Sequence, residues 1–261
     1  MRICILSQQH FSKKHVSQDM IDAFETAIIT DESIETLRIN ISEIIYKINR
    51  KISSVGGVLR PLVLDAKTVY EVKLFNPDYV FIMAMGPGTL EFEIPFLRKI
   101  KSRKIVYCID TWEASYPAWE KVIKEAGIDI VFCAYRSSLP FFSKIVDHTF
   151  FLPQSFNEKW FYPRCDENKT HLLMQMGRKN SSLDEFAHRY IAEKGLQDSD
   201  YVRELKKGEI IYPEFSDLGE AIAKTSFFIL SPRDVDDKSF TGKISDVTAR
   251  FYEGMASKTL L

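Results

Sequence analysis

The chain has 261 residues, of which 45% are hydrophobic, and it carries 35 basic and 36 acidic side chains. That length is enough for one large core or two small ones, and the formal net charge of −1 provides no strong field to attract nucleic acid or an anionic membrane. No apolar stretch approaches the roughly 20 residues that a membrane-spanning helix needs, and the first residues do not have the features of a signal peptide. We therefore expect a cytoplasmic protein without a transmembrane segment.

Apolar runs alternate with helical patterns through the first part of the chain. This alternation predicts a doubly wound parallel sheet with helices between its strands. Expected strands cover Arg2–Leu6, Ile34–Ile39, Tyr79–Met85, Lys104–Ile109, Ile128–Ala134 and Thr149–Leu152. The first expected helix begins near Ser17, and another follows Thr89, which is expected to cap it. The other expected helices cover Ile41–Ile52, Leu64–Phe75, Tyr116–Ala126, which Gly127 ends, and Ser138–Ile145.

The rhythm breaks at PQSFNEKWFYP, residues 153–163. This stretch is bounded by prolines and has no clear period, so we interpret it as a linker between a domain at 1–152 and a domain at 164–261. Its aromatic residues, Trp160 and Phe161, are expected to pack at the junction.

The second domain repeats the alternation of strand and helix. Predicted in order are a strand at His171–Met176, a helix that Ser182 caps, an exposed charged segment at Gly195–Gly208, a short strand at Glu209–Tyr212, a helix at Leu218–Ala223 and a strand at Phe227–Leu230. A polar loop then precedes a helix with Arg250 and Glu253, and a new apolar run starts at Leu260. Strand, loop, helix and strand form the βαβ unit of a parallel sheet.

The four cysteines are Cys4, Cys108, Cys133 and Cys165. None is in a C-x-x-C pair, which disfavours a zinc site or a dithiol centre, and the first three lie in apolar runs where Cys acts as a small buried hydrophobe. The sequence also lacks G-x-S-x-G, G-x-x-x-x-G-K-[ST] and H-E-x-x-H, and it has no G-x-G-x-x-G after the first strand. Serine hydrolases, P-loop ATPases, zincins and dinucleotide oxidoreductases are disfavoured accordingly.

Residues Val247 to Leu261 resemble the donor-site segment of GT-B glycosyltransferases of the group 1 type. The pattern Arg250-x-x-Glu253-x-x-Ala256, followed by a strand, is similar to the branch of spore-maturation glycosyltransferase-like proteins. A related branch has two glutamates here, but the first position in this chain is Ser245, which favours the Arg-x-x-Glu branch. The resemblance implies two Rossmann-like domains, a nucleotide-sugar as substrate without a further cofactor, and a glutamate, Glu253, that holds the ribose hydroxyls.

The donor diphosphate is expected at the first turn of the second domain. Gly177 and Arg178 lie where a strand becomes a helix, and free N–H groups at a helix start attract phosphate. The resemblance implies that the glycine and the basic residue contact the diphosphate, with help from Lys179 or Arg250. The alternatives stay open, since Arg178 can be an exposed turn residue and Arg250 can pair with Asp246 instead.

Two further groups of residues could contribute chemistry. Asp110 and His10 follow expected strands, and each could be the general base that an acceptor hydroxyl needs, or only a loop residue. Asp234 and Asp236 form a D-x-D pattern that could bind a divalent metal, but a charged loop is the simpler interpretation and we predict no metal site. Three aromatic residues could stack on a sugar ring, although core packing suits them better: Trp112, Tyr116 and Trp119.

The sequence therefore predicts a metal-independent glycosyltransferase that binds its nucleotide-sugar in the second domain and an unknown acceptor in the first. The chain ends at Leu261, where the resemblance implies more sheet and a returning helix. We expect a shortened second domain, or a protein partner or oligomer that completes it. A non-catalytic binding or assembly module of the same architecture is the alternative, and a metal-dependent transferase is a third.

Overall fold

The computed structural model describes residues 1–7, 16–40, 62–164, 169–176, 180–203, 211–231, 238–244 and 247–261. The chain divides into two compact units, Met1–Pro153 and Gln154–Leu261. Residues 154–163, most of the stretch interpreted as a linker, thus belong to the second unit.

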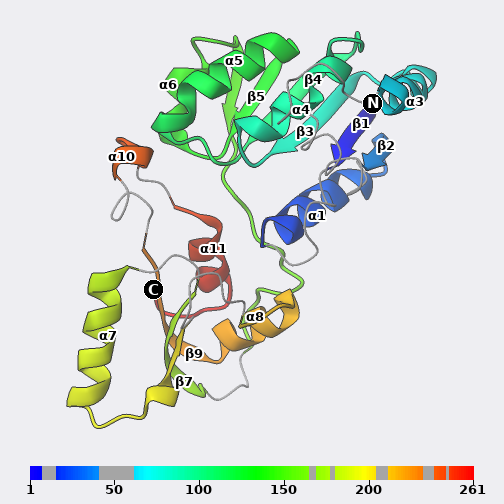
Figure 1. Ribbon diagram of the computed structural model, residues 1–261. Helices are drawn as coiled ribbons and strands as arrows, with labels where there is room; N and C mark the ends of the chain where they lie inside the picture. The colour runs from blue at the N-terminus through cyan, green and yellow to red at the C-terminus, as the bar shows by residue number, and fades with distance from the viewer. Residues whose placement is uncertain are drawn as a thin grey trace. The chain divides into compact units, whose positions relative to one another are not determined.

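The first unit is built on a six-stranded parallel sheet in the order β2-β1-β3-β4-β5-β6 (Figure 1). A parallel strand cannot be reached by a tight hairpin, so each connection crosses over the sheet. The strands are β1 (Arg2–Ser7), β2 (Glu35–Asn40), β3 (Tyr79–Ala84), β4 (Arg103–Cys108), β5 (Ile130–Cys133) and β6 (His148–Phe151). The helices are α1 (Val16–Ile29), α3 (Leu62–Phe75), α4 (Pro87–Leu97), α5 (Tyr116–Ala126) and α6 (Leu139–Phe142), with short 3-10 turns η2 (Glu113–Ser115) and η3 (Arg136–Ser138).

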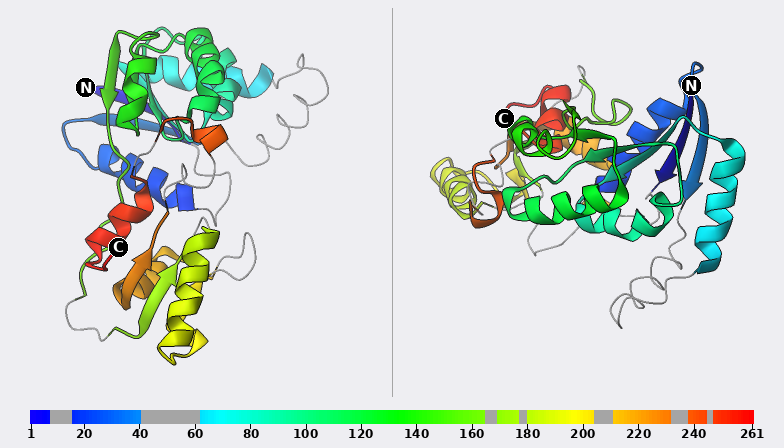
Figure 2. Two further views of the ribbon diagram at one scale, coloured as in Figure 1. Left: turned by 90° about the vertical axis from the view of Figure 1, so that its left-hand side faces the viewer. Right: turned by 90° about the horizontal axis from the view of Figure 1, so that it is seen from above.

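Both faces of this sheet are covered, as the continuous apolar strand at Tyr79–Met85 predicts. Alternate residues such as Val80 and Ile82 pack with α3, α4, α5 and α6 in the main core. The intervening Phe81 contacts the other face, where its ring stacks on Phe24 of α1 with centroids 5.7 Å apart. Figure 2 shows α4 and α5 side by side over the first of these faces.

The second unit has a smaller parallel sheet in the order β8-β7-β9. Its strands are β7 (His171–Gln175), β8 (Tyr201–Arg203) and β9 (Thr225–Ile229), and its helices are α7 (Ser181–Glu193), α8 (Phe215–Ala223), α10 (Lys238–Thr241) and α11 (Ala249–Ala256), with a 3-10 turn η4 (Asp198–Asp200). Met174 and Phe228 pack beneath α8 and α11, whereas Leu173 packs beneath α7 on the opposite face. The predicted class, α/β with two Rossmann-like parallel sheets, is confirmed.

Several local predictions are confirmed. Gly127 ends α5 in the left-handed conformation, with φ of 65°. Cys4, Cys108 and Cys133 are free and buried, and burial raises the pKa of the Cys4 thiol to about 12. Trp112 and Trp119 are core residues. No helix within the described residues is long and apolar enough to cross a membrane.

Other local predictions are wrong. Thr89 does not cap α4, because that helix already begins at Pro87, after the N-cap Gly86. Ser182 does not cap α7, because Asn180 occupies the N-cap and its side chain accepts from the Leu183 N–H at 3.0 Å.

The segment predicted to be charged and exposed contains β8, because Tyr201 is buried and pairs with Leu173 of β7. Phe161 packs inside the second unit's own core, with Trp160 against it. The expected helix at Ile41–Ile52 lies outside the described residues, as do Cys165 and the first half of the expected strand at Glu209–Tyr212.

Candidate functional site

Each sheet contains a topological switch point, the place where ligands of open α/β folds bind beyond the carboxyl ends of the strands. In the first unit the chain passes from β1 to its neighbour β2 and then crosses to β3 on the other side of β1. The second unit repeats this course, from β7 to β8 and then to β9. The crevices therefore lie between β1 and β3 and between β7 and β9.

The second unit brings Arg250 and Glu253 together on α11, one turn apart. An Arg250 guanidinium nitrogen (Nη1) donates to Glu253 Oε2 at 2.5 Å. The Glu253 side chain is only 5% exposed and that of Arg250 is 19% exposed. A buried carboxylate requires such a partner, because transferring its charge out of water is costly. Within the described part of the chain Oε1 of Glu253 forms no hydrogen bond, so one oxygen of this carboxylate can still accept one.

Contacts at both ends fix α11 against the sheet. At its start the Ala249 N–H donates to the buried Gln154 side chain at 2.8 Å, since Thr248 supplies no side-chain cap. Near its end Gly254 lies so close to β9 that a Cβ there would be 3.0 Å from the Phe228 ring. The chain then returns to the sheet, where Leu260 bridges Phe227 in parallel. The predicted βαβ unit that carries Glu253 is confirmed.

Polar side chains also gather at the carboxyl end of β7. Asn180, the α7 N-cap, donates from its amide to the Ser231 hydroxyl at 3.2 Å and so links the helix start to the residues after β9. Tyr201 Oη lies 2.7 Å from Gln175 Oε1 and 3.0 Å from Asp184 Oδ1. Burial, more than the neighbouring Asp184, raises the pKa of the Tyr201 hydroxyl.

The phenol of Tyr201 has one proton, so it donates to only one of these two oxygens. Both contacts are hydrogen bonds if the Gln175 amide N–H donates to Tyr201 Oη and the Tyr201 hydroxyl donates to Asp184. This arrangement requires the oxygen and nitrogen of the Gln175 amide to exchange places. In the present orientation the Gln175 amide nitrogen is buried and has no hydrogen-bond partner among the described residues. Sequence reasoning missed Gln175, Asn180 and Tyr201, although a polar residue at the last position of an apolar strand was a readable signal.

Asp110 lies at the carboxyl edge of the first sheet, directly after β4 and Ile109. Its backbone is fixed on both sides, because its N–H donates to the Met85 carbonyl at 3.0 Å and its carbonyl accepts from Trp119 Nε1 at 3.1 Å. The side chain is half-buried. At the next strand end the Thr111 and Ser138 hydroxyls lie 2.8 Å apart.

The remaining predicted site residues lie outside the described residues: His10, Gly177, Arg178, Lys179, Asp234 and Asp236. Within the described ranges no group of three His, Cys, Asp or Glu side chains could hold a metal ion.

Comparison with known proteins gives similarity of fold and no match in sequence. No family model and no curated protein matches the chain. Among solved structures it is similar to Anabaena HepE in complex with UDP and glucose, at 12% identity and a TM-score of 0.50, over 87% of this chain and 73% of that one. It is similar at the same TM-score to sucrose-phosphate synthase from Thermosynechococcus elongatus, at 8% identity, over 87% of this chain and 74% of that one. The chain thus shares the two-sheet α/β fold of these proteins.

Proposed function

We propose that this protein is a glycosyltransferase that moves a sugar from a nucleotide-sugar to an acceptor hydroxyl, without a metal ion or a further cofactor. The observation that carries the proposal is the buried Glu253 on α11, held in a βαβ unit with one carboxylate oxygen that accepts no hydrogen bond from any described residue. The fold similarity to HepE, whose structure contains UDP and glucose, supports it.

The second unit would bind the nucleotide. The free oxygen of Glu253 would accept from a ribose hydroxyl, an interaction that suits a carboxylate because each of its oxygens has two acceptor sites. Arg250 pairs with Glu253 through Nη1. Its other guanidinium N–H groups would contact a diphosphate while that ion pair is kept. Gly177, Arg178 and Lys179 precede α7, and we propose that they bind the diphosphate with the N–H groups at that helix start.

The first unit would bind the acceptor, with Asp110 or His10 as general base. In the displacement the acceptor oxygen bonds to the anomeric carbon as the bond from that carbon to the diphosphate breaks. The acceptor proton passes to the base, and the charge that develops on the diphosphate is stabilised by the arginine and lysine side chains. Asp110 suits the role because its backbone is fixed at the carboxyl edge of the sheet while its side chain keeps some exposure.

The test is the affinity for UDP and for a panel of nucleotide-sugars, measured by calorimetry on the wild type, Glu253→Gln and the control Glu193→Gln. Glu193 is an exposed residue at the end of α7. We expect Glu253→Gln to weaken binding about tenfold to a hundredfold, the range for a hydrogen bond to a charged group, and Glu193→Gln to leave it unchanged. Equal affinities for all three proteins would remove Glu253 from the site.

The same experiment separates the proposed enzyme from a non-catalytic module. Release of UDP from a nucleotide-sugar, by transfer or by slow hydrolysis, supports an enzyme. Tight binding of a nucleotide-sugar without any release, together with retention of a protein partner, would favour the binding or assembly module. A protein partner or a second copy of this chain stays a prediction.

A further inference from the structure

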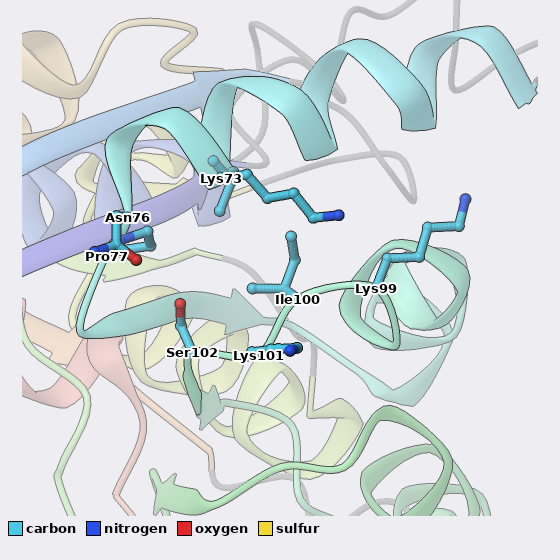
Figure 3. A pocket seen from close by; sticks show the side chains of 8 residues that line it. Lys73, Asn76, Pro77, Lys99, Ile100, Lys101 and Ser102 are labelled. Atoms are coloured by element: carbon cyan, nitrogen blue, oxygen red, sulfur yellow. The ribbon is translucent and has the colours of Figure 1, made fainter.

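A separate hollow of about 340 Å³ lies at the amino-terminal edge of the first sheet, where β3 and β4 begin. Figure 3 shows it between the last turn of α3 and the connection from α4 to β4. Val72, Pro77 and Ile100 are buried beneath it, whereas Lys73, Lys99 and Lys101 stand around it with Asn76 and Ser102. It lies at the opposite end of the strands from Asp110, so it is not part of the site described above.

The charge of this hollow is one-sided. Three of its eight lining residues are lysines and none is acidic. Lys73 and Lys101 form no ion pair or hydrogen bond within the part of the chain that the structure describes. Other lysines of the same unit pair with glutamates, as Lys121 does with Glu91 and Lys124 with Glu120. In a chain with nearly equal numbers of acidic and basic residues, Lys73 and Lys101 are thus two cations at this hollow without an acidic partner among the described residues.

Helix dipoles explain only part of the arrangement. Lys73 is in the last turn of α3 and Lys99 follows α4, positions where a cation favourably meets the negative end of a helix. However, the last carbonyls of α4 already accept bonds from the N–H groups of residues 98–100. Lys101 lies beyond that turn, and the Ser102 hydroxyl and the Asn76 amide add uncharged donors to the lining of the hollow. The dipoles therefore do not explain why donors surround a hollow.

We propose that this hollow binds a phosphate monoester carried on a small organic molecule. A lysine ammonium is a point charge that suits phosphate, and the hydroxyl and amide donors can complete the phosphate's hydrogen bonds. The apolar floor of Val72, Pro77 and Ile100 provides a surface for the organic group. The volume is within the range of small-molecule sites.

The experiment titrates ¹⁵N-labelled protein at low salt with inorganic phosphate and with phenyl phosphate, and follows backbone amide shifts. Three proteins are compared: the wild type, Lys73→Gln/Lys101→Gln, and the control Lys121→Gln/Lys124→Gln, which loses the same total charge. In the wild type and the control we expect saturable shifts at Ile100, Lys101 and Ser102, with tighter binding of phenyl phosphate. The Lys73/Lys101 double variant should bind about tenfold more weakly, the sum of two exposed ion pairs.

Two results would overturn the proposal. Equal affinities in all three proteins, or shifts spread over other surfaces, would show that these lysines form no site. Phenyl phosphate binding no tighter than inorganic phosphate would remove the role of the apolar floor. Unchanged spectra of the double variant outside residues 72–102 confirm that it is folded, so a loss of binding cannot come from unfolding. Since no nucleotide is used, the outcome is independent of the proposed transferase activity.

Discussion

A buried carboxylate in the first unit shows how a single residue couples stability to pH. Glu25 on α1 is fully buried, accepts from the Ser7 hydroxyl at 2.7 Å and pairs with Arg38 at 2.8 Å. Burial raises the pKa of the Glu25 carboxyl, while Ser7 and Arg38 oppose that rise and Asp22 adds to it slightly. Because the folded-state pKa is above the unfolded value, this group's stabilising contribution is present at low pH and is lost as the pH rises through the folded pKa.

We therefore expect Glu25→Gln to gain stability relative to the wild type as the pH increases from 4 to 7. Glutamine keeps the shape of the side chain but does not titrate. The difference in the free energy of unfolding between the two proteins should grow by no more than about 1.4 kcal/mol per pH unit, the limit for one proton. Urea denaturation at several pH values measures it, with the exposed Glu32→Gln as control. A flat difference would mean that Arg38 and Ser7 cancel the effect of burial on the Glu25 pKa, and a difference of opposite sign would mean that they outweigh it.

At the scale of elements, strands and helices with strong periodicity were predictable and short or irregular ones were not. Tyr79–Met85 and Lys104–Ile109 were recognisable because a strand covered on both faces is a nearly continuous apolar run. β8 was not, because only Tyr201 of its three residues is fully buried and its neighbours are charged. The predictions of helix caps were wrong because several polar residues lie near each helix start and the sequence does not determine which one adopts the capping conformation. Ser182 and Asn180 illustrate this.

The candidate site was also predictable only in part. The position of Glu253 in a βαβ unit followed from the apolar runs on either side of it, and the structure has that unit. The ion pair with Arg250 did not follow, since the spacing of Arg250 permits a bond to Asp246 as readily as to Glu253. Gln154, which supplies the missing cap of α11 from a distance of 95 residues, could not be found from local sequence at all.

Close packing between α8 and the start of the second unit leads to a prediction about Gly219. A Cβ at this position would meet the backbone carbonyl oxygen of Trp160 at 2.2 Å, and a backbone atom cannot swing away as a side-chain end can. We expect Gly219→Ala to destabilise the second unit by about 2 kcal/mol, since overpacking outweighs the gain of about 1 kcal/mol in helix propensity. Chemical denaturation measures the change.

The matched control for Gly219 is Gly88, another glycine inside a helix. A Cβ at Gly88 in α4 would meet no atom within 4 Å, so Gly88→Ala should keep the propensity gain and leave the first unit as stable or slightly more stable. If both substitutions had the same effect on stability, the contact of Gly219 with Trp160 would not be what requires glycine.

At the scale of the whole molecule, each unit has its own sheet and its own apolar core, so ligand binding can act on one unit without ordering the other. The proposed function places the nucleotide in the second unit alone. Binding stabilises whatever structure holds the ligand, by about 2.7 kcal/mol when the free ligand is at a hundred times its dissociation constant. Amide hydrogen exchange reports this stabilisation locally.

We expect saturating UDP to slow amide exchange in β7, β9 and α11, the elements around Glu253, and to leave β1, β3 and β4 unchanged. In Glu253→Gln the slowing should be smaller at every one of these positions when the UDP concentration is the same, because less of the protein is bound. Phenyl phosphate should act in the opposite unit, on the start of β4 next to Ser102, and should be insensitive to Glu253→Gln. Slowing by UDP in the first unit alone would place the nucleotide there and exclude the second unit as the donor domain.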